Sequence, residues 1–237
     1  YWDFGDGNTS EEAEPTHCYT ETGEYTVELT CIDNDGGIGS DTKKITVTNT
    51  LSGSLVVDEI WSGKIELSDA VTVPVGLNLT IEPGTLVEIT PEKELVIDGN
   101  LEINGLNGQE VFLTVGSKYP MGSKWKGLRI NPGTAQVRIS NTQIMRAERG
   151  ITLIERDAYF EQLKLTENVV GLHLYNASPT IIHCTIVNNE LYGIKEDEYC
   201  MPILSGNYFF NNLAGDYYDS VLTILPSAKL GELNNEN

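Results

Sequence analysis

Basic side chains are scarce in this sequence. Its 237 residues include 15 Lys and Arg against 35 Asp and Glu, which gives a formal net charge of −20 at pH 7. A surface with such an excess of carboxylates repels the phosphates of nucleic acids and the headgroups of acidic lipids. We therefore expect no nucleic-acid partner, and we interpret the charge as serving either solubility or the binding of cations.

Long apolar runs are also missing. No run approaches the ~20 residues that a membrane-spanning helix needs, so we expect no insertion into a membrane. No segment has the pattern of a signal peptide either. The first four residues, Tyr1-Trp2-Asp3-Phe4, resemble the middle of a strand. We interpret Tyr1 as a cut or processed end, so the missing signal carries no conclusion about secretion.

Cysteine occurs at only four positions, and none of the spacings is that of a metal site such as C-x-x-C. Cys31 shares strand parity with Val27, so we expect it to face a core. Two alternatives stay open. The chain has either four separate core thiols, with Cys184 and Cys200 among them, or a Cys18–Cys31 disulfide.

Alternating apolar and polar residues mark strands in the first 49 residues. The segment Tyr25–Cys31 alternates along its whole length, as a strand with one buried face does. Ile45–Val47 repeats the pattern, and Gly23 and the cluster at 33–37 are turn signals between strands. Short strands at this spacing predict an all-β sandwich.

Three motifs in this region resemble those of a PKD domain. They come in the family's order: Trp2-Asp3-Phe4-Gly5-Asp6-Gly7, Pro15-Thr16-His17-Cys18-Tyr19 and Gly23-Glu24-Tyr25-Thr26-Val27. The resemblance implies that residues 1–49 are the C-terminal part of an immunoglobulin-like sandwich whose first strands would precede Tyr1. It also implies an extracellular spacer or adhesive module without catalysis of its own.

Asp33 and Asp35 are the candidate metal ligands. They lie in the turn 33–37 and offer clustered carboxylate oxygens, which calcium prefers. The alternative is that these side chains accept hydrogen bonds from the backbone of their own turn. No full set of calcium ligands is visible, and we predict no other cofactor.

Glycines recur at a nearly constant interval in the second half of the chain. They lie at positions 127, 150, 171, 193 and 215, with spacings of 23, 21, 22 and 22 residues. Short aliphatic runs lie between turn residues, and helix-period stretches are nearly absent. Such a period predicts a parallel β-helix with three strands in each turn and about seven turns in all.

Asparagines recur with a similar period. Asn188-Asn189 precedes Asn211-Asn212 by 23 residues. Side chains that stack at one corner of a coil can hydrogen-bond from turn to turn, so we predict an asparagine ladder there.

The coil region resembles the right-handed parallel β-helix proteins, which have the pectin lyase-like fold, in the branch found in bacterial and archaeal surface proteins. The resemblance rests on the stretch 73–85, on Gly99-Asn100-Leu101 and on Trp125-Lys126-Gly127-Leu128. It implies a β-helix over residues 55–237. The run of mostly small residues at 50–54 predicts a short linker between this coil and the first domain. This fold hosts lyases, hydrolases, adhesins and inert stalks, so it does not choose a function.

Catalytic residues of the kinds used by enzymes of this fold do not stand out on the coil. There is no Asp-Asp pair and no Gly-His-Gly. His173 and His183 lie among strand residues and are expected to face solvent. We therefore predict no catalytic residue.

The longest irregular stretch, residues 116–125, is the candidate contact loop. Tyr119, Lys124 and Trp125 offer aromatic rings and a cation that could bind a glycan. The alternative is that Trp125 packs into the core.

The sequence therefore favours a non-enzymatic structural or adhesive module outside the cell or on its surface. It would be a stalk, or a component of a surface layer or filament. Its partners would be further copies of itself joined by strand exchange, a polysaccharide or a cell-surface protein. The alternative is a carbohydrate-active enzyme fragment or a polysaccharide-binding module.

Overall fold

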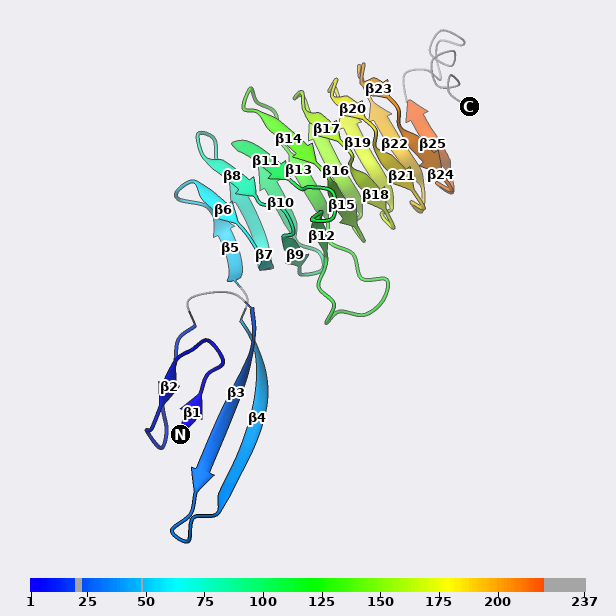
Figure 1. The fold of residues 1–237 in the computed structure, drawn as a ribbon. Helices are drawn as coiled ribbons and strands as arrows, with labels where there is room; N and C mark the ends of the chain where they lie inside the picture. The colour runs from blue at the N-terminus through cyan, green and yellow to red at the C-terminus, as the bar shows by residue number, and fades with distance from the viewer. Residues whose placement is uncertain (20–22, 48, 220–237) are drawn as a thin grey trace. The chain divides into compact units, whose positions relative to one another are not determined.

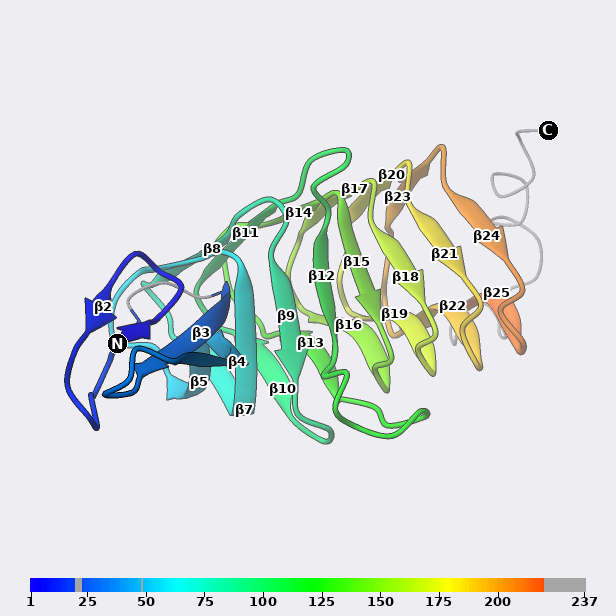
Figure 2. The ribbon, with the colours of Figure 1, turned by 60° about the horizontal axis from the view of Figure 1, so that its bottom comes forward.

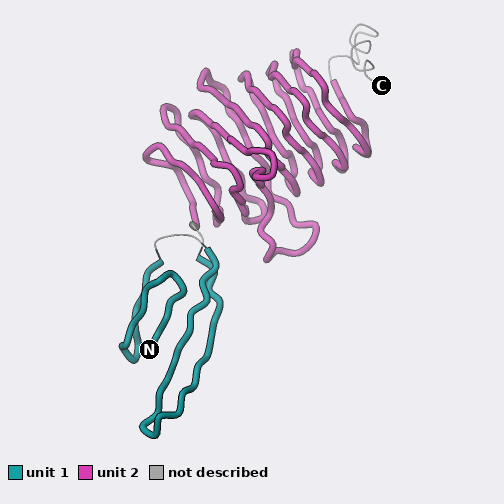
Figure 3. The backbone as a smooth tube through the Cα atoms, in the orientation of Figure 1, with its two compact units in different colours: residues 1–49 teal, residues 50–237 magenta. Residues whose placement is uncertain are grey.

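The computed structural model describes residues 1–19, 23–47 and 49–219, which form strands and no helix. The fold is all-β, as the sequence predicted. The chain divides into two compact units, residues 1–49 and 50–237 (Figure 3). Within the described part, no helix is long and apolar enough to span a membrane.

The first unit is an antiparallel sheet in the order β2-β1-β3-β4. Its strands are β1 (Trp2–Asp3), β2 (Thr9–Ser10), β3 (Gly23–Ile32) and β4 (Ile38–Val47). The last two form a long hairpin, paired from Gly23↔Val47 to Ile32↔Ile38. Alternating residues give this hairpin its two faces.

Aromatic rings form the core of the first unit. The ring of His17 stacks on Phe4 at 4.1 Å, and Tyr19 stacks on Tyr25 at 4.3 Å. The Tyr19 hydroxyl donates a hydrogen bond to the carbonyl of Phe4 over 2.9 Å. This packing covers the half of the hairpin that carries Val27, which is buried.

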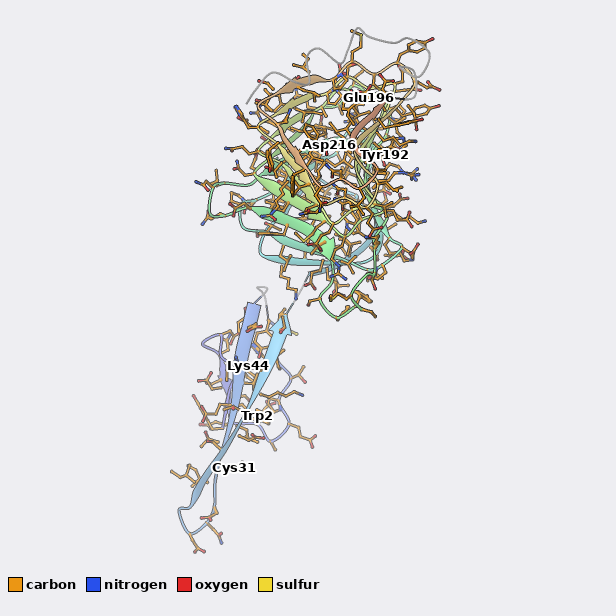
Figure 4. All side chains as sticks on the ribbon, turned by 90° about the vertical axis from the view of Figure 1, so that its right-hand side faces the viewer. Trp2, Cys31, Lys44, Tyr192, Glu196 and Asp216 are labelled. Carbon is orange, nitrogen blue, oxygen red and sulfur yellow. The ribbon has the colours of Figure 1, made fainter. Side chains whose placement is uncertain are left out.

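Cys31 does not face this core. The whole segment 31–44 is exposed, and Cys31 lies toward the far end of the hairpin (Figure 4). The expectation from strand parity was wrong because no described residue packs over that end of the sheet. Cys18 and Cys31 are exposed, whereas Cys184 and Cys200 are buried in the coil.

The second unit is a β-solenoid of about eight turns, one more than the sequence predicted (Figures 1 and 2). Each full turn contributes one strand to each of three faces, and the strands within a face pair in parallel. β7 (Lys64–Val73) bends round a corner, so that its first half pairs with β9 on face 1 and its second half with β10 on face 2.

Face 1 continues through six strands after β7: β9 (Leu86–Ile89), β12 (Val111–Val115), β15 (Thr142–Met145), β18 (Lys164–Thr166), β21 (Thr185–Val187) and β24 (Tyr208–Phe210). Face 2 continues through β10 (Glu94–Ile97), β13 (Gly127–Ile130), β16 (Arg149–Ile154), β19 (Val170–Tyr175), β22 (Tyr192–Asp197) and β25 (Gly215–Asp219). Face 3 consists of β6 (Glu59–Trp61), β8 (Asn78–Ile81), β11 (Asn100–Asn104), β14 (Val137–Ser140), β17 (Tyr159–Glu161), β20 (Thr180–Ile182) and β23 (Ile203–Ser205).

Residues 50–54, expected to be a linker, belong to a strand. β5 (Asn49–Ser54) pairs with β7. Leu51 packs against the coil core, and the backbone amide of Leu55 donates to the carbonyl of Thr72 over 2.9 Å. The sequence did not predict this strand, because its small residues do not alternate with apolar ones, and Leu51 is the residue that packs against the core.

The coil interior is filled by columns of aliphatic side chains. On face 2, Leu128, Ile151, Leu172 and Ile194 are neighbours on successive turns, and each is at most 1% exposed. Burial of one such side chain contributes about 2 kcal/mol. The repeat in the sequence is therefore the repeat of one continuous core.

The glycine period results from the close approach of successive turns. A Cβ on Gly150, Gly171 or Gly193 would lie 2.5–2.6 Å from a carbonyl oxygen of the next turn. No side chain fits at that distance. The last glycine of the predicted series, Gly215, does not continue this column. Asp216 lies beside Gly193 instead.

The predicted asparagine ladder is confirmed, and it includes Asn168. The backbone amide of Asn168 donates to Oδ1 of Asn189, and the backbone amide of Asn189 donates to Oδ1 of Asn212, each over 3.2 Å. A second, exposed ladder joins Nδ2 of Asn211 to Oδ1 of Asn188 over 2.8 Å. Both residues have positive φ angles, 54° and 57°, which asparagine tolerates better than most residues.

Candidate functional site

Trp125 is a core residue, so the proposed contact role for it was wrong. Its side chain is 0% exposed, and its indole Nε1 donates to the carbonyl of Met145 over 2.9 Å. The small side chain of Ala147, which bridges to Trp125 on the next turn, leaves room for the indole.

Tyr119 and Lys124 attach the contact loop to the coil. The Tyr119 hydroxyl hydrogen-bonds Oγ1 of Thr90 over 3.1 Å. The Lys124 ammonium pairs with Glu190 at 2.8 Å and donates to the carbonyl of Glu167 over 3.2 Å. The three residues therefore do not form a shared exposed surface, and the exposed apolar side chain of the loop is Met121, at 99%.

Asp33 forms the turn at the tip of the β3–β4 hairpin. One of its oxygens, Oδ1, accepts hydrogen bonds from the backbone amides of Asp35 (2.9 Å) and Gly37 (2.7 Å). Within residues 1–19, 23–47 and 49–219, no group of three or more His, Cys, Asp or Glu side chains is placed to hold a metal ion. The geometry matches the turn alternative, and calcium binding by Asp33 and Asp35 stays a prediction.

Two of the three histidines have structural positions. His17 belongs to the aromatic core of the first unit and pairs with Asp6 at 2.8 Å. His183 lies at a corner of the coil with φ 52°. His17 also lines a cavity of about 440 Å³ with Glu14 and Tyr19, among apolar side chains such as Phe4 and Val27.

Three charged side chains are buried in the described part of the chain, Glu88, Arg156 and Glu196, and the sequence reasoning identified none of them. Arg156 is 4% exposed, and its guanidinium donates to the carbonyls of Ala135 (2.7 Å) and Gly99 (2.5 Å), which ties a loop to the previous turn. Glu196 is 0% exposed and accepts a hydrogen bond from the Tyr217 hydroxyl. Burial and this carboxylate raise the pKa of Tyr217. Arg156 and Glu196 therefore each hydrogen-bond groups from other turns of the coil.

A cavity lined by several polar side chains lies on the outer surface of face 2. It has a volume of about 250 Å³ and spans four neighbouring strands, β10, β13, β16 and β19. Its lining combines basic, acidic and hydroxyl side chains: Glu94, Lys126, Arg129, Glu148, Arg149, Thr152, His173 and Tyr175. Sequence reasoning missed it, although Lys126 and Arg149 each precede a glycine of the repeat and so fall on adjacent turns.

The charges around the cavity are unevenly paired. Nε of Arg129 lies 3.3 Å from a carboxylate oxygen of Glu94. Lys126 and Arg149 are exposed, and neither has an acidic partner within 4.0 Å among the residues the structure describes. Their two positive charges are therefore open to a ligand.

His173 lies at the rim of this cavity as a neutral side chain. Burial lowers its pKa, and the positive charges of Lys195 and Arg149 act in the same direction against the opposing effect of Asp197. Because a carboxylate only accepts, Nε2 of His173 donates to Asp197 over 2.7 Å. Asp197 also binds the Lys195 ammonium, at 2.6 Å.

The second ring nitrogen of His173, Nδ1, carries the lone pair but is buried. It has no hydrogen-bonding partner among the described residues. A general base must lie within hydrogen-bonding reach of the proton it removes. The geometry of His173 therefore suits the positioning of Asp197, and the cavity as a whole suits the binding of an anion.

The comparisons with known proteins agree with the architecture of the first unit. A family model described as PKD domain matches residues 1–48. No solved structure matches the chain.

Several relatives are similar over part of the chain. A protein named collagenase ColA from Clostridium perfringens is 61% identical over 120 residues, which is 48% of this chain and 10% of that protein. A collagenase ColA from Bacillus cereus is 56% identical over 46 residues, or 19% of this chain and 5% of that protein. A pre-pro-metalloprotease PrtV from Vibrio cholerae is 52% identical over 46 residues, with the same two shares. The chain thus spans about a tenth or less of these relatives.

Proposed function

We propose that this chain is a non-catalytic accessory module that works outside the cell, where it spaces or attaches a larger protein. The observation that supports it best is the size of the shared segment. Two of the three relatives share only 46 residues, or 5% of their length, with the chain. A segment of that length matches the extent of the first unit and not that of a whole enzyme.

The names of the relatives support the extracellular location that we propose. Two are collagenases, and collagen is an extracellular substrate. A module shared with such enzymes is expected to work where they do. Outside the cell, an oxidising environment favours disulfides between accessible cysteines. The exposed thiols of Cys18 and Cys31 would then be open to oxidation.

The attachment role rests on the construction of the coil. About eight turns with a continuous aliphatic core make a rod that resists local unfolding, as a stalk or a component of a surface layer requires. Its partner would be another copy of the chain, a cell-surface protein or a polysaccharide. Self-assembly by strand exchange predicts oligomers, so a monodisperse monomer in light scattering at high concentration would contradict that part of the proposal.

Two assays on the purified chain test the proposed function. We expect no product from collagen peptides or from neutral and acidic polysaccharides, with or without calcium. We also expect the chain to be retained on intact bacterial cells or on insoluble extracellular matrix. Turnover that disappears in a His173→Gln or Asp197→Asn variant would show an enzyme instead, and the carbohydrate-active alternative would then lead.

A further inference from the structure

The cavity on face 2 continues along the coil as a groove. A second cavity, of about 440 Å³, lies beside the first and shares Glu148 and Arg149 with it. Its lining extends the groove to β22, with Tyr192 and Lys195. The groove therefore crosses five successive strands of one face, from β10 to β22, and runs across the strands in the direction of the coil axis.

The groove is lined by four basic side chains, Lys126, Arg129, Arg149 and Lys195, against two acidic ones, Glu94 and Glu148, in a protein of net charge −20. The nearby carboxylate of Asp197 is already paired with Lys195 and His173, so it presents little free negative charge to a ligand. Lys126 and Arg149 keep their charges, and they lie on adjacent turns, where the backbone amide of Arg149 donates to the carbonyl of Lys126 over 3.2 Å. Adjacent turns are about 4.8 Å apart, so one anionic group can reach both side chains.

We propose that this groove binds an acidic saccharide chain, with Lys126 and Arg149 pairing with its carboxylate or sulfate groups. The planar fork of Arg149 matches either oxyanion in a bidentate manner, while Lys126 acts as a point charge. This proposal deepens the attachment role and rests on it, because it names the class of ligand.

A saccharide fits the groove better than an acidic peptide does. The strands beneath the groove, β10 to β22, are each paired on both sides, so they offer no free edge for an extended peptide to extend the sheet. The lining instead offers groups that bond hydroxyls: the carboxylate of Glu148, the hydroxyl of Thr152 and the exposed part of Tyr175. They line the same cavity as Lys126 and Arg149, so a chain that carries both hydroxyl and acidic groups finds partners for both.

Calorimetric titration of the whole chain with defined oligosaccharides tests the proposal. The probes are a hyaluronan oligosaccharide (carboxylates only), a chondroitin sulfate oligosaccharide (carboxylates and sulfates), a neutral chito-oligosaccharide of equal length and a polyglutamate peptide. We expect saturable binding of one or both acidic saccharides, and at least tenfold weaker binding of the neutral one and of the peptide. The two acidic probes decide whether carboxylate or sulfate is recognised.

Variants locate the site. Lys126→Gln with Arg149→Gln is expected to weaken the binding of the acidic saccharide at least tenfold, and both side chains are exposed, so the fold is retained. Lys43→Gln with Lys44→Gln removes the same charge from exposed positions in the first unit and is expected to change little. Equal affinity of the Lys126/Arg149 variant and the parent chain would overturn the proposal.

The pKa of His173 distinguishes binding in the groove from nonspecific attraction elsewhere on the surface. A bound anion beside Arg149 offsets the positive charges that disfavour protonation of His173, so its pKa is expected to rise. Imidazole NMR signals, assigned with a His173→Gln variant, follow this pKa with and without saccharide. An unchanged pKa on saturation, or equally tight binding of polyglutamate, would also overturn the proposal. If the chain adheres to cells or matrix but binds neither acidic saccharide, the groove proposal fails and the attachment role stands.

Discussion

Asp6 is the residue whose ionisation most clearly supports the first unit. Burial opposes the charge of Asp6, but hydrogen bonds from the backbone amide and side chain of Asn8 and from His17 outweigh that effect. They lower the pKa of Asp6 from 3.8 to about 2. The motif that resembles a PKD strand and turn thus contains a carboxylate whose charged form is stabilised by hydrogen bonds within the same unit.

This shift predicts an acid-dependent loss of stability. Because the folded-state pKa lies below the unfolded-state value of 3.8, the stabilisation by Asp6 is fully present well above that value and is lost as the pH falls through about 2. We expect Asp6→Asn to be less stable than the parent chain at pH 7, and the difference to shrink toward pH 2. Thermal unfolding of both proteins from pH 2 to pH 7 measures this difference, and a difference independent of pH would contradict the assignment.

Gly171 is the residue at which the approach of successive turns can be tested. An added Cβ would lie 2.6 Å from the carbonyl oxygen of Gly193, which belongs to rigid backbone. We expect Gly171→Ala to lower the free energy of unfolding by about 3 kcal/mol, measured by urea unfolding of the coil. Gly133→Ala is the matched control, because the nearest atom there is a side-chain nitrogen of Arg156 at 3.8 Å. Similar losses in the two variants would show that the tight contact is not the cause.

At the scale of elements, the repeat in the sequence predicted the coil well. A glycine that must lie against the next turn, and an asparagine that must bond the next turn, both recur with the period of the coil, so their spacing predicts the register of successive turns. The strand at 50–54 was not predicted, because the pairing of a strand of small residues depends on the neighbour β7 and not on its own pattern. The sequence left open whether Trp125 is exposed or buried for a similar reason. The small neighbour Ala147 on the next turn becomes apparent only from the register of the two turns.

The candidate site was less predictable than the fold. A groove on the outside of a coil is made by residues about 22 positions apart, and its charge depends on which cations are already paired. Lys195 and Lys126 look alike in the sequence, but Asp197 neutralises the first, and the second has no acidic partner in the described part of the chain. Pairing of this kind depends on side-chain conformations that a linear pattern does not contain.

The buried asparagine ladder is the element that holds one corner of the coil together. Asn189 is 0% exposed; its Oδ1 accepts from the backbone amide of Asn168, and its Nδ2 donates to the carbonyl of Leu165 over 3.2 Å. Asn189→Ala removes the acceptor of the buried Asn168 amide and the side-chain donor to the Leu165 carbonyl, so we expect a loss of about 3 kcal/mol. Urea unfolding measures the loss.

An exposed ladder residue provides the control for Asn189. Oδ1 of Asn78 likewise accepts a hydrogen bond from Nδ2 of Asn100 over 2.7 Å, but Asn78 is exposed to solvent. Water can replace the lost groups there, so Asn78→Ala is expected to cost less than about 1 kcal/mol. Equal losses at the two sites would mean that burial of the ladder contributes nothing.

At the scale of the whole molecule, each unit has its own core. The cluster of buried apolar residues in the coil runs from Leu55 to Cys200 and includes no residue of the first unit. The first unit depends instead on a small set of aromatic contacts around Phe4 and Tyr19. Stability scales with the buried apolar surface, so the coil should be the more stable unit and should not need the other to fold.

This separation predicts that the coil unfolds at the same temperature with and without the first unit. Trp61 and Trp125 are 2% and 0% exposed in the coil, whereas Trp2 belongs to the first unit. In a Trp2→Phe variant, tryptophan fluorescence therefore reports the coil alone. We expect its thermal midpoint to match that of a chain limited to residues 50–237 within about 2 °C, because a stabilising contact of 1 kcal/mol would shift a unit of this size by about 2–4 °C. A larger shift would mean that the first unit is part of the stability of the coil, and the chain would then act as one rigid piece and not as two modules in series.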